Sequence, residues 1–219
     1  MAHSRRRTGL TWVAGVRTVW RVVEDGEFYC PGCGGDRCYQ RLEGRRRLTV
    51  LGVPLLPRGT AVPVVECSFC RNRFTLQTLG APTTVRLSLM LRDAVQTIAL
   101  AVLAAGGTES RAAREAAVDS VRTGGHPDCT EERLLTLLAV VSAEGREALE
   151  NELRAALTPL APHLATVGRE TLLRDAARIA LADGRYLAAE SAALAEIGTA
   201  LALAPTDTER LLTEAGQGV

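Results

Sequence analysis

Four cysteines in the first third of the chain have the spacing of metal ligands. Cys30 and Cys33 form one C-x-x-C pair, Cys67 and Cys70 form a second, and residues 34–66 separate the pairs. Two such pairs that approach each other can supply four thiolates in a tetrahedron, which is what a structural zinc ion takes from protein. The residues within and just after the pairs favour tight turns that direct backbone N–H groups at sulfur: Pro31, Gly32, Gly34, Gly35 and Ser68.

This spacing predicts a zinc ribbon, although two other uses of paired cysteines compete with it. A redox C-x-x-C usually occurs as one pair beside a βαβ pattern, and this region lacks that pattern. Two disulfides would be typical of an exported protein. We expect no export signal, because Arg17 and Arg21 interrupt the apolar segment near the N-terminus and no small-x-small cleavage site follows it.

The other potential nucleophiles carry no catalytic pattern. Cys38 lies five residues after Cys33 and has no partner at ribbon spacing, and Cys129 stands alone in the second half of the chain. Neither can be paired from the sequence with a histidine and an orienting carboxylate. The histidines lie in the tail or beside prolines, where surface or capping roles are common. We therefore expect free thiols and no enzymatic activity.

The charge divides the chain into two electrostatically different parts. All 26 basic residues are arginine. Residues 1–80 contain 13 arginines and 6 acidic residues, for a net charge of +7, whereas residues 81–219 have a net charge of −6. A basic first part could contact nucleic acid, anionic lipid or the chain's own acidic part. Few aromatic residues lie among these arginines, which argues against a platform for base stacking.

The apolar segments are expected to form soluble cores rather than membrane spans. The longest uninterrupted ones, at 50–56 and 98–105, are far shorter than the roughly 20 residues that a spanning helix needs. With neither a span nor an export signal expected, we predict a cytoplasmic protein.

The elements around the cysteines are predicted to be short strands. β-branched and aromatic residues predict strands at 13–23, 39–42, 46–53 and 74–79, with turns at 24–26 and 43–44, while 61–66 returns the chain to the second cysteine pair. We expect a basic tail at 1–12, a zinc ribbon at 13–80 and a linker at 81–83.

From residue 84 onward, apolar residues follow helical spacing and predict about seven helices. We expect a first helix that ends at Gly106 and Gly107, a second at 109–122 and a third that starts after Asp128 or Thr130. The fourth is bent or ended by Thr158 and Pro159, and the others lie at 171–182, at 188–204 and from Thr206 onward. Capping boxes are predicted at Asp128 with Glu131 and at Thr206 with Glu209. The fold class is α+β.

The turn L-A-D-G-R-Y-L-A-A-E at 181–190 resembles the A-D-G-x-x-x-x-x-E turn of TerB-like (tellurite resistance) helical domains. The likeness covers roughly residues 84–215. The segments at 26–31 and 52–57 are similar to zinc ribbons fused to TerB domains in some bacteria. The resemblance implies a small β zinc ribbon followed by an all-α TerB-like bundle at 84–219.

The resemblance also gives Asp183 and Glu190 a candidate role. In the family, acidic residues of two repeated turns form a surface proposed to bind divalent cations or a partner. Here Leu187 replaces the usual serine at the helix start, and the first turn, near 105–109, lacks A-D-G. Since Ca²⁺ and Mg²⁺ take six or more oxygen ligands, the pair could form only a weak cation site. Alternatively, Glu190 caps the following helix.

These observations lead to two functional hypotheses. The first is a non-enzymatic binding or scaffold protein of a tellurite, metal or envelope stress response. It would have structural Zn²⁺, a protein partner and a link to a membrane-associated stress complex, a context that comes from the resemblance. The second is a zinc ribbon that binds nucleic acid, with the helices as an effector or dimerisation domain.

Overall fold

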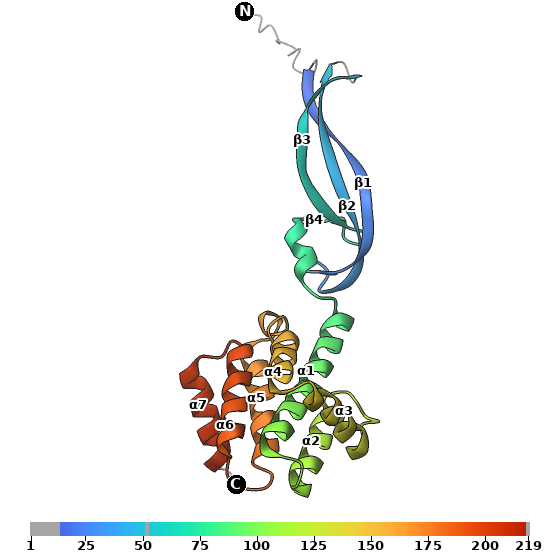
Figure 1. Ribbon diagram of the computed structural model, residues 1–219. Coiled ribbons are helices and arrows are strands. Elements are labelled where there is room, and N and C mark those ends of the chain that lie inside the picture. The colour runs from blue at the N-terminus through green and yellow to red at the C-terminus, as the bar shows by residue number, and fades with distance from the viewer. Residues whose placement is uncertain (1–13, 51–52, 218–219) are drawn as a thin grey trace, which may run out of the picture. The chain divides into compact units, whose positions relative to one another are not determined.

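The computed structural model describes residues 14–50 and 53–217, which form two compact units (Figure 1). The first, here called the β unit, ends at Thr84, and the second, the helical unit, begins at Val85. The predicted tail at 1–12 lies outside the described residues. A four-stranded antiparallel sheet precedes seven helices along the described chain, which confirms the α+β class.

The β unit is a meander of three long strands and one short strand. Its elements are β1 (Ala14–Cys30), β2 (Gly35–Val50), β3 (Val53–Cys67), β4 (Arg73–Phe74) and the short 3₁₀ helix η1 (Leu76–Gly80). The strands lie in the order β1-β2-β3-β4, each antiparallel to the next. The cysteine pairs therefore lie at adjacent strand ends: Cys30 ends β1 and Cys67 ends β3.

Both turns predicted inside the first strands are wrong. The register of β1 against β2 shifts between Val22 and Glu24, so residues 24–26 follow a β-bulge and continue the strand. Gly44 lies within β2, where a Cβ atom would stand 2.7 Å from the Cγ2 atom of Thr18 and 2.9 Å from the ring of Trp20. The glycine is needed for this close approach between strands and not for a turn.

The strand predicted at 74–79 is also wrong. Only Arg73 and Phe74 pair with β3, and the chain then turns into η1. Leu76 and Leu79 pack from this 3₁₀ helix against the small core of the β unit. A strand would have placed alternate residues on opposite faces, whereas the 3₁₀ turn brings Leu76 and Leu79, at i and i+3, to one side.

The helical unit contains the seven predicted helices. They are α1 (Thr84–Gly106), α2 (Arg111–Thr123), α3 (Glu131–Ala143), α4 (Arg146–Leu157), α5 (Thr166–Ala180), α6 (Ala188–Ala200) and α7 (Pro205–Gln217), with the 3₁₀ turn η2 (Ala161–His163) before α5 (Figure 1). Helix α5 begins five residues before its predicted start at 171. Helix α6 ends at Ala200, four residues before its predicted end.

Two predicted capping boxes are wrong because the helices begin elsewhere. Thr130 caps α3, and its side chain accepts a hydrogen bond from the N–H of Arg133 at 3.2 Å, so Asp128 lies before the cap. Helix α7 begins at Pro205, which places Thr206 inside its first turn. Proline is favoured at the first helical position because it needs no hydrogen-bond acceptor there.

The core of the helical unit consists mainly of alanine and leucine. Helix α1 is its longest helix, and residues 94–95 and 97–103 of it are buried. By length and composition, α1 is the one helix in the described chain that could cross a bilayer. The prediction that no segment is long enough to span a membrane considered only uninterrupted apolar runs, and it therefore did not identify α1. Its buried second half belongs to the hydrophobic core of the unit.

We predict that a fragment comprising residues 84–219 folds without metal. Its helices have their own caps and a continuous core, so its stability should not depend on the cysteine centre. Circular dichroism in the presence of EDTA should show a helical spectrum and one cooperative thermal transition. A disordered fragment beside a helical full-length chain would contradict the prediction.

Candidate metal centre and acidic turn

The structure brings Cys30, Cys33, Cys67 and Cys70 together at one end of the β unit. Their sulfur atoms all lie within 4.8 Å of one another. The distances are 3.8 Å from Cys30 Sγ to Cys70 Sγ and 3.9 Å from Cys33 Sγ to Cys67 Sγ. Four sulfurs at about 2.3 Å from one tetrahedral ion would lie about 3.8 Å apart. The four cysteines could therefore bind a metal ion.

The same distances argue against the disulfide alternative. A disulfide requires a sulfur separation of about 2.05 Å. All six cysteines, including Cys38 and Cys129, are free thiols in the structure. Cys38 is exposed on β2, and Cys129 is buried before α3.

The two cysteine turns have matching backbone geometry. In the first, the N–H of Gly34 donates to the carbonyl of Cys30 at 2.9 Å, and Gly34 has a φ of 67°. In the second, Arg71 takes the equivalent place, with a φ of 59° and a 3.0 Å hydrogen bond to the carbonyl of Cys67. The left-handed residue after each pair turns the chain back, so that both cysteines of a pair face the same point.

The β unit surrounds this centre with a small aromatic core. Phe28, Tyr39 and Val65 are buried together with Cys30 and Cys67. The ring of Phe28 lies 5.5 Å from that of Tyr39 and 6.1 Å from that of Phe74, measured between centroids. A core of this size contributes little stability by itself, so we expect the centre to supply much of it.

The electrostatics of the cysteines depend on burial and on nearby N–H groups. Burial raises the pKa of Cys33 to about 12, and hydrogen bonds with neighbouring thiols add to this. Burial also raises the pKa of Cys67. However, backbone hydrogen bonds from Cys70 and Phe69 outweigh that effect and lower the pKa to about 7. N–H groups of the second turn thus stabilise a thiolate at Cys67, as the sequence indicated for such turns.

Replacing Cys67 with serine should remove bound metal and unfold the β unit, because binding energy at such a site is largely folding energy. Metal analysis of the purified chain should fall from about one ion to none, and the β-unit thermal transition should disappear. Cys38→Ser is the matched control and should leave both unchanged. Full metal content in Cys67→Ser, or its loss in Cys38→Ser, would show that the ligands are misassigned.

The acidic turn places its two carboxylates in different environments. Glu190 is only 2% exposed, and its Oε2 atom accepts the N–H of Leu187 at 2.7 Å, which caps α6. Asp183 is exposed. Within residues 14–50 and 53–217, the only group of three or more potential metal ligands is the cysteine cluster, so these carboxylates belong to no such group.

Gly106, at the end of α1, explains how Glu190 is accommodated. A Cβ atom at Gly106 would overlap the Oε1 atom of Glu190. The first acidic turn of the family was expected near residues 105–109. In this chain, that segment instead contacts the carboxylate of Glu190, which belongs to the second turn. Sequence reasoning missed this contact, and its only local signal was the glycine pair at 106–107.

We predict that Glu190→Gln lowers the free energy of unfolding of the helical unit by about 0.5 to 1 kcal/mol, because the amide still accepts a hydrogen bond but loses its negative charge at the helix start. Millimolar Ca²⁺ should leave the melting temperature of the wild-type chain almost unchanged. Asp183→Asn is the exposed control. A calcium-dependent rise in melting temperature that both substitutions abolish would establish a cation site.

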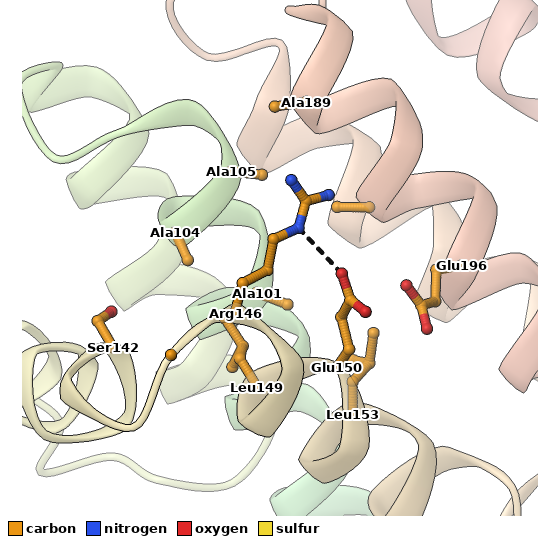
Figure 2. Close-up of a pocket in the computed structure, with 12 residues that line it drawn as sticks. Ala101, Ala104, Ala105, Ser142, Arg146, Leu149, Glu150, Leu153, Ala189 and Glu196 are labelled. Atoms are coloured by element: carbon orange, nitrogen blue, oxygen red, sulfur yellow. Dashed lines mark hydrogen bonds and ion pairs between the residues drawn. The ribbon is translucent and has the colours of Figure 1, made fainter.

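A pocket of about 250 Å³ lies between α1, α4 and α6 of the helical unit (Figure 2). Its wall consists of small or aliphatic side chains, which include Ala101, Ala104, Ala105, Leu149, Leu153 and Ala189. Charged side chains surround it: Arg146 pairs with Glu150 at 2.9 Å, and Arg154 pairs with Glu196 at 2.9 Å. The sequence showed only alanine-rich helix faces here and did not predict a pocket.

The helical unit matches one known family. The family model described as tellurite resistance protein TerB covers residues 92–213, which is more than half of the chain. No curated protein and no solved structure is similar enough to count as a match. The matched segment includes the acidic turn, Gly106 and all the residues that line the pocket, while the cysteine centre precedes it. By this match, the chain belongs to the TerB family of tellurite resistance proteins.

Proposed function

We propose that this protein is a non-enzymatic scaffold of a tellurite, metal or envelope stress response. The observation that carries the proposal is the TerB match over residues 92–213 in a chain that also gathers four cysteines around one point. In this proposal, the β unit is held together by a metal and the helical unit binds a protein partner. The protein acts in the cytoplasm of a bacterium, where its partner belongs to a membrane-associated stress complex.

The metal that fits the cysteine centre best is zinc. Four thiolates in a tetrahedron favour Zn²⁺ or iron over Mg²⁺ and Ca²⁺, which prefer oxygen ligands. Four protein ligands would leave no open position for water or a substrate. This closed donor set supports a structural role for the ion.

The partner site proposed for the helical unit is the pocket between α1, α4 and α6. Its volume of about 250 Å³ suits one or two side chains of another protein. The apolar wall provides burial for such side chains, and the paired charges of Arg146 and Glu150 at the rim can form polar contacts with the partner backbone. An exposed segment with a small aliphatic anchor is the partner chemistry that fits this pocket.

A complementation experiment tests the function and the site together. Cells that lack the gene should become sensitive to tellurite, and the wild-type gene should restore growth. Ala104→Phe should fail to restore it, because the ring would fill the pocket from the exposed side of α1. Ala112→Phe, on the exposed side of α2, is the matched control and should restore growth.

The two parts of the proposal fail in different ways. Unchanged tellurite resistance in cells without the gene would contradict the stress function. Full rescue by Ala104→Phe would contradict the pocket as the partner site while leaving the function in place. Thermal melting of both purified variants should show that each retains the wild-type fold.

A further inference from the structure

One face of the β1–β2 pair gathers arginine side chains. Directly opposed residues on antiparallel strands share a face, and β1 pairs with β2 through Arg17 with Arg47 and Val19 with Arg45. Alternate residues along a strand also share a face, which adds Arg21. We call Arg17, Arg21, Arg45 and Arg47 the basic face. Arg45 and Arg47 lie about 7 Å apart along their strand, and Arg17 and Arg21 about 13 Å.

The four guanidinium groups of the basic face are available to a ligand. All four residues are exposed, and none forms an ion pair with any residue of the described ranges. The acidic residue opposite Arg21 is Glu43, whose carboxylate lies 3.9 Å from Arg41. Two exposed arginines of the helical unit, Arg111 and Arg146, instead pair with glutamates one turn away, at 2.8 and 2.9 Å.

The basic face is also concave. A hollow of about 540 Å³ lies over part of it and is lined by three of its arginines, Arg21, Arg45 and Arg47, by one acidic residue, Glu43, and by Val19, Val23 and Thr60. Three arginines against one glutamate leave the lining with a net positive charge. A concave surface of net positive charge concentrates anions and fits the convex edge of a rod-shaped polyanion better than it fits a flat bilayer.

Aromatic side chains are missing from the residues that line this hollow. Trp20 alternates with Val19 and Arg21 and so points to the opposite face, where the guanidinium of Arg73 lies 4.9 Å from its ring. Binding of single strands uses aromatic stacking, and membrane-surface binding uses aromatic or long apolar anchors. The basic face therefore offers positive charge but neither aromatic rings for base stacking nor anchors for a membrane surface.

We propose that the basic face binds the phosphodiester backbone of a nucleic acid duplex. The contacts are electrostatic and independent of sequence, because guanidinium groups that reach phosphate oxygens read no base edges. The activity is additional to the scaffold role and does not depend on it.

Fluorescence anisotropy of a labelled 24-base-pair DNA duplex with the metal-loaded full-length chain tests the proposal. If each of the four arginines contacts one phosphate, a plot of the logarithm of the binding constant against the logarithm of the salt concentration should have a slope of about −3.6. The triple variant Arg21→Gln, Arg45→Gln, Arg47→Gln should bring the slope to about −0.9 and weaken binding at least about tenfold at low salt. The same measurement with an RNA duplex of equal length shows whether the bound phosphodiester backbone is that of DNA or of RNA.

The control triple Arg111→Gln, Arg133→Gln, Arg178→Gln removes the same charge from the helical unit and should keep the wild-type slope. If the first triple loses metal, single substitutions such as Arg45→Gln should each reduce the slope by about 0.9. Equal losses in both triples would overturn the proposal. So would a single strand bound as tightly as the duplex, or a preference for vesicles containing phosphatidylglycerol that the basic-face variants abolish.

Discussion

The β unit depends on the convergence of four sulfur atoms at one point. Its buried core is limited to a few aromatic and aliphatic side chains around Phe28, and two of its five buried members are cysteines. Strands as long as β1 and β2 need a fixed end, because most of their side chains face solvent. The two matching turns, closed by Gly34 and Arg71, provide that end. The first cysteine turn also begins the pairing of β1 with β2, whose register shifts once, between Val22 and Glu24, before it reaches the basic face.

The helical unit follows a different rule, in which small residues allow close contact between helices. A Cβ atom at Gly124 would lie 2.6 Å from Val95, and one at Gly198 would lie 2.6 Å from Thr208. Gly106 gives the same space to the carboxylate of Glu190. Because alanine and glycine remove bulk from the contacts, the helices pack around leucine side chains with very few aromatic residues. The same small residues leave the pocket between α1, α4 and α6.

The two units thus present two different kinds of surface. The helical unit, which contains the TerB match, is acidic and carries a pocket with an apolar wall and paired charges at its rim. The β unit carries, on one exposed face, arginines that form no ion pair with any residue that the structure describes. A pocket with paired charges favours a protein segment, and unpaired cations on a concave sheet favour a polyanion. The proposed scaffold role and the proposed duplex binding therefore use different surfaces of the same chain.

The sequence by itself determined the features that depend on local spacing. Two C-x-x-C pairs specified the residues that meet at the centre, and helical periodicity after residue 84 gave the seven helices of the second unit. Tertiary structure decided what depends on non-local contacts. The local sequence around Gly44 predicts a turn, but the position has to be glycine because side chains from β1 and β3 come close to it. The carboxylate of Glu190 lies against Gly106, which is 84 residues earlier in the chain. The arginines became one face only through the pairing of β1 with β2, because strand register places distant residues together and no local pattern records it.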